Sequence, residues 1–181
     1  MLLAQGRILS LKLLHPSVLL RLLRSLLLAG LGGTIRYLEK VGITQGGAPG
    51  RPGVGDRFRR PRLLAAMSAI RRYEAVLSKA LVERVGGVPG VDIHGITDPD
   101  RTAERCPTVA FTIDGHGPPD ITRFLGERGI YVRNGDHYAW ELHRALGLGD
   151  SGGTVRVSLG HYNTAAEIER FGAALNELVV A

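Results

Sequence analysis

Cysteine and lysine are the scarce residues of this 181-residue chain. Cys106 is its single cysteine, and only three of its 23 basic residues are lysines. A single cysteine excludes a disulfide within the chain, which agrees with a reducing compartment, and we therefore expect a cytoplasmic protein. The three lysines, Lys12, Lys40 and Lys79, leave few amines for chemistry that needs a lysine nucleophile.

Long apolar runs are also absent. Arg21 and Arg24 interrupt the leucine-rich, acid-free residues 1–28, so that no uncharged run approaches the roughly 18 residues that a membrane span needs. A continuous apolar stretch and a small-residue cleavage site, which a signal peptide needs, are missing as well. Residues 1–28 are either an organelle transit peptide or a stretch that is not native protein, of the kind an upstream frame change would produce. We favour the second interpretation, and we expect no membrane partner.

Charge divides the chain into two parts of opposite sign. Residues 1–62 hold eleven Lys/Arg and two acidic residues, a balance of +9, whereas residues 63–181 hold twelve Lys/Arg and fifteen acidic residues, a balance of −3. Nucleic-acid-binding domains carry a basic surface. The mildly acidic larger part therefore argues against a nucleic-acid partner.

Residues 29–62 predict a short helix and a linker. Leu31, Ile35 and Leu38 recur at helical spacing within residues 29–41, and Gly42 is expected to end the helix. Residues 43–57 are rich in glycine and proline, which is typical of a linker. The arginines that follow form either an anion-binding patch or, as we favour, a solvated basic turn; they are Arg57, Arg59, Arg60 and Arg62.

Residues 63–181 predict one domain. A long helix is expected over 63–85, and the order β-β-α-β-α-β-α follows it, with a capping box at Thr164 and Glu167 opening the last helix. This order predicts an α+β (α/β) fold, in which helices pack a small sheet of three or four strands. The expected segments are strands 91–95, 107–114, 130–133 and 154–159, turns 98–100 and 134–137, a helix 121–128 capped by Asp120, and a helix 138–146.

Two arginines mark a candidate site within this domain. Arg133 ends one expected strand and Arg156 lies in another, with Asp136 and His137 in the turn after the first. An arginine is costly to bury without an anion, and its planar fork suits a carboxylate. The pattern indicates a site for a small acid. The alternative is that both arginines face solvent or pair with Asp136 and Glu141.

The same stretch resembles the C-terminal part of class V aminotransferases, and among them cysteine desulfurase-like proteins, which are pyridoxal-phosphate (PLP) enzymes of fold type I. Residues 133–138 read Arg-Asn-Gly-Asp-His-Tyr, where the family has an Arg-X-Gly-X-His-Cys loop. Residues 155–158 read Val-Arg-Val-Ser and residues 162–164 read Tyr-Asn-Thr, both as in the family. Weaker resemblance extends back to about Arg57, with a short echo at residues 29–42.

The resemblance implies substrate-binding roles. Arg156 would hold the α-carboxylate of an amino-acid substrate, and Arg133 would line the substrate entrance. His137, which lies in the arginine loop, would contact the substrate; the alternative is a residue at the start of a helix that faces water. The rest of the active-site loop would be Asn134, Gly135, Asp136 and Tyr138. Tyr138 stands where desulfurases have their cysteine nucleophile, and a tyrosine cannot carry sulfur as a thiolate does. Sulfur transfer by the usual route is therefore not expected.

The cofactor site of the family has no counterpart in the sequence. No lysine lies in the Ser-X-X-Lys setting in which the family binds PLP, and the family's large cofactor domain would precede these residues. We expect the small C-terminal domain of a PLP-dependent enzyme, with no catalytic residue of its own, no cofactor bound by this chain alone and no activity in isolation. Whether the chain is itself an enzyme stays open. Family members are usually homodimers.

Other interpretations remain. The chain could be a non-enzymatic carboxylate-binding or protein-interaction module, or a fragment that docks on a separate cofactor domain. A metal site is not expected, because His137 and His143 are six residues apart and the other histidines show no ligand spacing. The expected organisation is a leucine- and arginine-rich segment 1–28, a helix and linker 29–62, and the domain 63–181.

Overall fold

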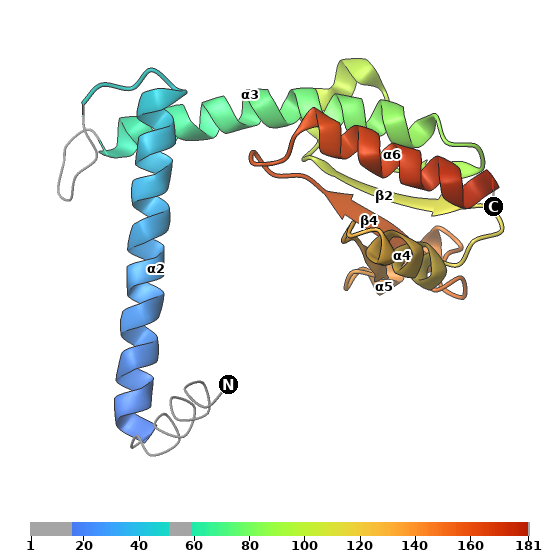
Figure 1. The fold of residues 1–181 in the computed structure, drawn as a ribbon, viewed down its shortest axis with the longest axis horizontal. Coiled ribbons are helices and arrows are strands. Elements are labelled where there is room, and N and C mark those ends of the chain that lie inside the picture. Colours follow the sequence, from blue (N-terminus) through green and yellow to red (C-terminus); the bar gives the residue numbers. More distant parts are fainter. Residues whose placement is uncertain (1–15, 51–58, 181) are drawn as a thin grey trace. The chain divides into compact units, whose positions relative to one another are not determined.

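The computed structural model describes residues 16–50 and 59–180 (Figure 1). The chain forms two compact units, Met1–Ala69 and Ile70–Ala181. Helix α3 (Arg59–Gly86) begins in the first unit and ends in the second. The domain boundaries expected from the sequence, after residues 28 and 62, stay predictions.

Helix α2 (Pro16–Thr44) shows that the short helix expected at 29–41 was wrong in both limits. Its leucines are strong helix formers, which favours the longer helix. Gly42 does not end the helix: a Cβ atom there would collide with the backbone of Arg62 on α3, so glycine permits the two helices to approach closely. Among the described residues, no helix is long and apolar enough to cross a membrane.

A buried ion pair lies within the first unit. Arg62, expected in a solvated turn, is 1% exposed, and its Nη1 atom lies 3.7 Å from Oε1 of the fully buried Glu39. Arg62 also donates from Nε to the carbonyl of Pro49 (3.0 Å), and Arg59 Nε lies 3.5 Å from the same Glu39 oxygen. A buried charge needs a partner of opposite charge, so the expectation of a solvated turn was wrong for Arg62. Arg57 lies outside the described residues.

The second unit is built on a four-stranded antiparallel sheet of order β1-β2-β4-β3. The observed succession confirms the expected order of strands and helices and the α+β class. The elements are β1 (Val91–His94), η1 (Pro99–Glu104), β2 (Thr108–Ile113), α4 (Pro118–Glu127), β3 (Arg133–Gly135), α5 (Trp140–Ala145), β4 (Thr154–Ser158) and α6 (Ala165–Val180).

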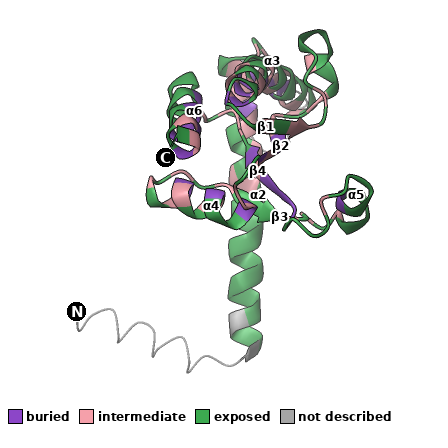
Figure 2. Cartoon of the chain, turned by 90° about the vertical axis from the view of Figure 1, so that its right-hand side faces the viewer, coloured by how far each residue is buried: buried purple, intermediate pink, exposed green. Residues whose placement is uncertain are grey.

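One face of this sheet carries the core. Side chains alternate along β2, so Val109, Phe111 and Ile113 are buried on the same face. Residues of α3, α4 and α6 complete the core, among them Leu81 and Leu175, both fully buried. In Figure 2, α4 and α6 lie on one side of the sheet and α5 lies on the other.

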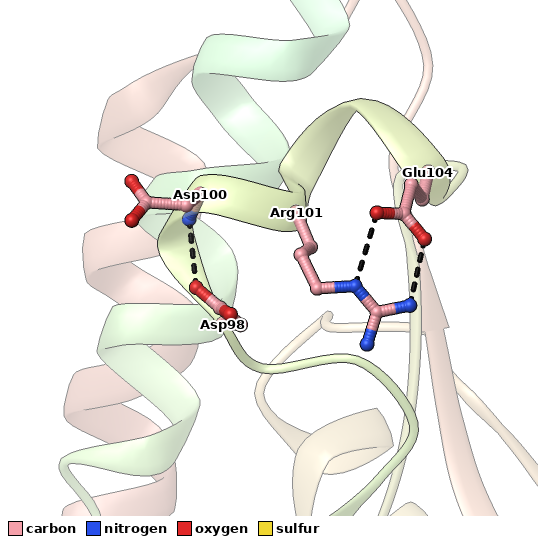
Figure 3. Close-up of polar contacts among 4 residues, drawn as sticks. All are labelled: Asp98, Asp100, Arg101 and Glu104. Carbon is pink, nitrogen blue, oxygen red and sulfur yellow. Dashed lines mark hydrogen bonds and ion pairs between the residues drawn. The ribbon is translucent and has the colours of Figure 1, made fainter.

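Figure 3 shows that the turn expected at residues 98–100 is the start of a short 3₁₀ helix, η1. The Asp98 side chain caps it by accepting a hydrogen bond from the Asp100 N–H (2.9 Å). Arg101 donates from Nε and Nη2 to the Glu104 carboxylate (3.0 and 2.7 Å). An Asx-type hydrogen bond serves both a turn and a helix cap, which is why sequence could not separate the two.

Of the two helix starts assigned from the sequence, the one at Thr164 is confirmed and the one at Asp120 is wrong. The capping box is confirmed, because Glu167 Oε2 accepts from the Thr164 N–H (2.7 Å) and the Glu167 N–H donates to Thr164 Oγ1 (3.4 Å). Asp120 is not the N-cap of α4: the helix begins at Pro118, and Asp120 accepts from Arg123 instead (2.6 Å). Proline fits the first helical position, where its missing N–H costs nothing.

Candidate functional site

Arg133 and Arg156 lie directly opposite each other on β3 and β4. Opposed residues of an antiparallel pair present their side chains on one face, and like charges in that position repel. Within residues 16–50 and 59–180, no carboxylate lies within ion-pair distance of either arginine. Glu141, one of the alternative partners, binds Arg144 instead (2.7 Å). The pair is a concentrated positive charge that an anion would relieve.

The arginines occupy the face of the sheet away from the core. Val155 and Val157 point into the core, so Arg156 between them points to the other face, the side on which Figure 2 shows α5. The residue opposite Arg156 on β2 is Ala110, whose small side chain leaves space beside the arginine. Arg156 is half-buried and Arg133 is exposed. Both guanidinium groups can therefore reach a ligand that lies on this face.

The expected strand 130–133 and turn 134–137 were misplaced. Strand β3 consists of Arg133, Asn134 and Gly135, so two of the expected turn residues pair with β4. Ile130 and Val132 pack against the core without joining the sheet. Ile130 and Val132 are apolar because they are partly buried, and the sequence pattern cannot distinguish such burial from strand pairing.

The loop between β3 and α5 has a strained backbone. His137 (φ 52°) and Tyr138 (φ 64°) both adopt the left-handed conformation, which costs roughly 1–3 kcal/mol for a residue other than glycine. Asp136 holds the loop, because its side chain accepts from the Tyr138 N–H (2.9 Å) and its carbonyl accepts from the Ala139 N–H (2.8 Å). Tyr138 is fully exposed. Strain of this kind is found at ligand-binding and switching loops.

A buried histidine supports this loop. From the sequence we considered it only as a possible metal ligand. His143 on α5 is 6% exposed; its Nδ1 bonds to the Ala139 carbonyl (3.1 Å) and its Nε2 to Thr154 Oγ1 (3.2 Å). A carbonyl can only accept, so Nδ1 carries a proton and donates it to Ala139, while Nε2 shares a second hydrogen bond with the Thr154 hydroxyl. The ring thus joins α5 to the first residue of β4. Local spacing could not reveal this contact, which joins separate elements.

His137 packs beside this buried histidine, with the two ring centroids 6.1 Å apart. Burial lowers the pKa of His137, and the charges of Arg156 and His143 lower it further, whereas a hydrogen bond with the Thr154 backbone and the charge of Asp136 raise it. Its Nε2 atom is buried and has no hydrogen-bond partner in the described part of the chain. A neutral imidazole beside the arginines is therefore the form present at pH 7. Among the described residues, no three His, Cys, Asp or Glu side chains gather in a metal-binding group.

In an NMR titration we expect the His137 ring to protonate below the ordinary imidazole pKa of about 6.5. The unfolded chain then binds this proton at higher pH than the folded chain. The free energy of unfolding should therefore decrease as pH falls from about 6.5 toward the folded pKa. His137→Asn, which keeps a residue tolerant of positive φ, should flatten this part of the pH dependence in urea unfolding. Equal pH dependence in both proteins would contradict the assignment.

The site motif and its surroundings match proteins already known. A sequence model of the family described as "Aminotransferase class-V" matches residues 63–171, more than half of the chain. A probable cysteine desulfurase of Methanothermobacter thermautotrophicus is 29% identical over 150 residues, which cover 82% of this chain and 30% of that protein. A probable cysteine desulfurase of Pseudomonas putida is 37% identical over 109 residues, 60% of this chain and 25% of that protein.

Solved structures agree with these matches. The apo structure of a cysteine desulfurase from Thermococcus onnurineus superimposes with a TM-score of 0.58 at 29% identity, covering 72% of this chain and 32% of that one. A cysteine desulfurase structure from Escherichia coli has a TM-score of 0.53 at 20% identity, which shows a shared fold alone. The chain spans about a third or less of the length of each of these relatives.

Proposed function

The chain belongs to the class V aminotransferase family, which is PLP-dependent, and we propose that it supplies the part of such an enzyme that holds an amino-acid substrate by its carboxylate. Arg156 binds the α-carboxylate. Arg133 and His137 line the same site, and Asn134, Gly135, Asp136 and Tyr138 form the loop beside them. The placing of Arg133 opposite Arg156, without a carboxylate partner among the described residues, is the observation that carries the proposal.

The geometry suits a planar anion. A guanidinium can donate two parallel hydrogen bonds to one carboxylate, and this fork fixes orientation as well as position. The rigid β4 strand, paired on both sides at Arg156, holds the guanidinium stem in place. Neutral His137 adds a hydrogen-bonding group without adding charge. The chain thus orients an amino acid by its carboxylate and leaves the amino group and the side chain free.

The described residues do not fit PLP itself. PLP chemistry needs a lysine amine next to the bound substrate. Lys79 lies on α3, on the core side of the sheet, and pairs with Glu83 (3.9 Å). Lys40 is on α2 in the other unit, and Lys12 lies outside the described residues. We therefore propose that this chain alone is inactive.

Arg156→Ala should abolish carboxylate binding. Each hydrogen bond to a charged group contributes about 1.5–3 kcal/mol, so loss of even one should raise the dissociation constant roughly 10- to 150-fold, and loss of both should raise it further. The measurement is an NMR titration of the full chain with L-alanine and, as a ligand control, with L-alaninamide, which lacks the carboxylate. Arg144→Ala, which removes an exposed arginine already paired with Glu141, is the matched control and should bind as the wild type does. Equal loss in both variants would show only a charge effect.

The affinity also separates two functions that the arginine pair supports. A part of an enzyme should bind L-alanine weakly, in the millimolar range, because the remaining contacts of the substrate lie elsewhere. A free-standing carboxylate-binding module should bind an amino acid in the micromolar range. Micromolar binding that Arg156→Ala abolishes would favour the module over the enzyme part.

Mixing the chain with PLP should yield no stoichiometric Schiff base. Borohydride reduction followed by peptide mass spectrometry should find no single lysine carrying the cofactor in full occupancy, because Lys40 and Lys79 are exposed surface amines. Low, scattered labelling of these lysines is the background to expect. A single lysine trapped in a one-to-one ratio would overturn the proposal that the chain lacks a cofactor site.

A further inference from the structure

The hydroxyl groups on either side of Arg156 along β4 already have partners. Thr154 and Ser158 each lie two residues from Arg156, so their side chains share its face of the sheet. Thr154 Oγ1 bonds to Nε2 of His143 (3.2 Å), and Ser158 Oγ shares a hydrogen bond with Thr108 Oγ1 (3.1 Å). A ligand of Arg156 therefore finds its further polar contacts across the sheet and not along the strand.

Across the sheet, Arg156 lies between a small apolar residue and a positive charge. On β2 it is opposite Ala110, and on β3 it is opposite Arg133. The residue beyond Ala110 is His94 on β1, whose ring already bonds to Thr112 Oγ1 (3.0 Å). The Arg133 guanidinium is exposed and has no hydrogen-bond or ion-pair partner within residues 16–50 and 59–180. The unpartnered charge beside Arg156 is therefore on the β3 side.

A single carboxylate does not neutralise this arginine pair. Opposed side chains of an antiparallel pair are neighbours, with Cβ atoms about 5 Å apart, and here they carry two positive charges. An α-carboxylate bound by Arg156 brings one negative charge and leaves the charge of Arg133 beside it. A second carboxylate on the same ligand would neutralise that charge and form its own forked hydrogen bonds with the guanidinium. Because the two arginines are neighbours, one small molecule can carry both carboxylates.

We propose that the amino acid held at this site is acidic, with a side chain of the length of aspartate or glutamate, and that its side-chain carboxylate binds Arg133. This inference rests on the proposed function, which assigns the α-carboxylate to Arg156. Arg156 is half-buried on a strand that is paired on both sides, which suits the group common to all amino acids. Arg133 is exposed on β3, at the edge of the sheet, and determines which side chain is accepted.

Two pairs of ligands test the proposal by NMR titration of the full chain: L-aspartate with L-asparagine, and L-glutamate with L-glutamine. The members of each pair have nearly the same size and differ in side-chain charge. At least one acid should bind about tenfold more tightly than its amide, the lower end for a hydrogen bond to a charged group, because Arg133 is exposed. That acid, and not its amide, should shift the Nε–H resonance of Arg133. Equal affinities within both pairs would overturn this inference, whereas L-alanine binding that depends on Arg156 would leave the proposed function intact.

Arg133→Ala and Arg144→Ala are the matched variants, because each removes one positive charge and Arg144 is paired with Glu141 outside the site. In Arg133→Ala the ratio of acid to amide affinity should fall from about ten to about one. In Arg144→Ala the ratio should stay at the wild-type value. A ratio lost in both variants would reflect net charge and overturn the inference. Equal loss of acid and amide binding in Arg133→Ala would overturn it too, since both arginines would then hold the same carboxylate. Failure of every amino acid to bind the wild type would overturn the proposed function as well.

Discussion

Replacing Gly153 with alanine is expected to lower the free energy of unfolding of the second unit by about 3 kcal/mol or more. Gly153 is buried, and its φ of +85° already disfavours any residue with a Cβ atom. A Cβ atom there would also collide with the carbonyl group of Gly135 on β3. The collision involves backbone on both sides, so β3 and β4 would have to separate. Urea unfolding followed by circular dichroism measures the loss.

The matched control is Gly147→Ala. Gly147 has a similar φ of +73° but is exposed and has no atom within 4 Å of the position of a new Cβ. Its replacement should lower the free energy of unfolding by only about 1–2 kcal/mol, which is the cost of holding a residue with a Cβ atom in the left-handed conformation. The excess cost at Gly153 is then the cost of separating the strands. Equal losses at the two positions would show that the contact with Gly135 has no effect on stability.

Gly153→Ala should also weaken carboxylate binding. Separation of β3 from β4 moves Arg133 away from its place opposite Arg156, and a ligand held by both would lose one contact. In Gly147→Ala the strand pairing is untouched, and L-alanine should bind as it does to the wild type. Gly153 therefore connects the stability of the sheet to the geometry of the proposed site.

Phe111→Ala is expected to destabilise the second unit by about 3–5 kcal/mol, as is typical of a fully buried aromatic. Phe111 is 0% exposed and packs edge-to-face on Phe171, with ring centroids 6.2 Å apart. It lies between Ile93 on β1 and Val155 on β4, at the centre of the sheet. Alanine would leave a cavity that neighbours on three strands cannot fill without moving the sheet.

Phe124→Ala is the control for loss of an aromatic ring. Phe124 is half-buried on α4, and its ring lies under the Arg128 guanidinium at 3.4 Å. Its removal should cost about 1–2 kcal/mol, because part of the ring is already in water. Urea midpoints should shift for both variants at a constant m-value. A smaller loss for Phe111→Ala than for Phe124→Ala would contradict the position of Phe111 in the core.

The strained loop beside the arginines carries an exposed tyrosine. Tyr138 occupies the position of the desulfurase cysteine in the motif, stands fully exposed and has a positive φ. The loop therefore presents a phenol to the surroundings instead of a thiol. Its conformation is held by Asp136 and, from the other side, by buried His143.

Much of the second unit could be predicted from local pattern. The alternation of β2 marked Val109, Phe111 and Ile113 as one buried face, and Thr164 with Glu167 marked the start of α6. These features depend on residues a few positions apart, whose geometry the backbone period dictates. The site motif was found in the same way, since residues 133–138 and 155–158 are two short stretches with a recognisable order.

The wrong predictions concern residues whose conformation depends on contacts with distant parts of the chain. Gly42 and Arg62 were misjudged because the close approach of α2 and α3 and the buried Glu39 are invisible to local spacing. Asn134 and Gly135 resemble turn residues, yet pairing with β4 made them a strand. The local preference of a residue for strand or turn is weak compared with such contacts.

By itself the sequence determined the α+β class, the family and the arginines of the proposed site, because each depends on residue type and on near neighbours along the chain. Only the tertiary structure decided that Arg133 stands opposite Arg156 and that His143 reaches Thr154. These are contacts between separate elements. Strand register and side-chain burial fix them, and neither quantity is defined until the chain has folded.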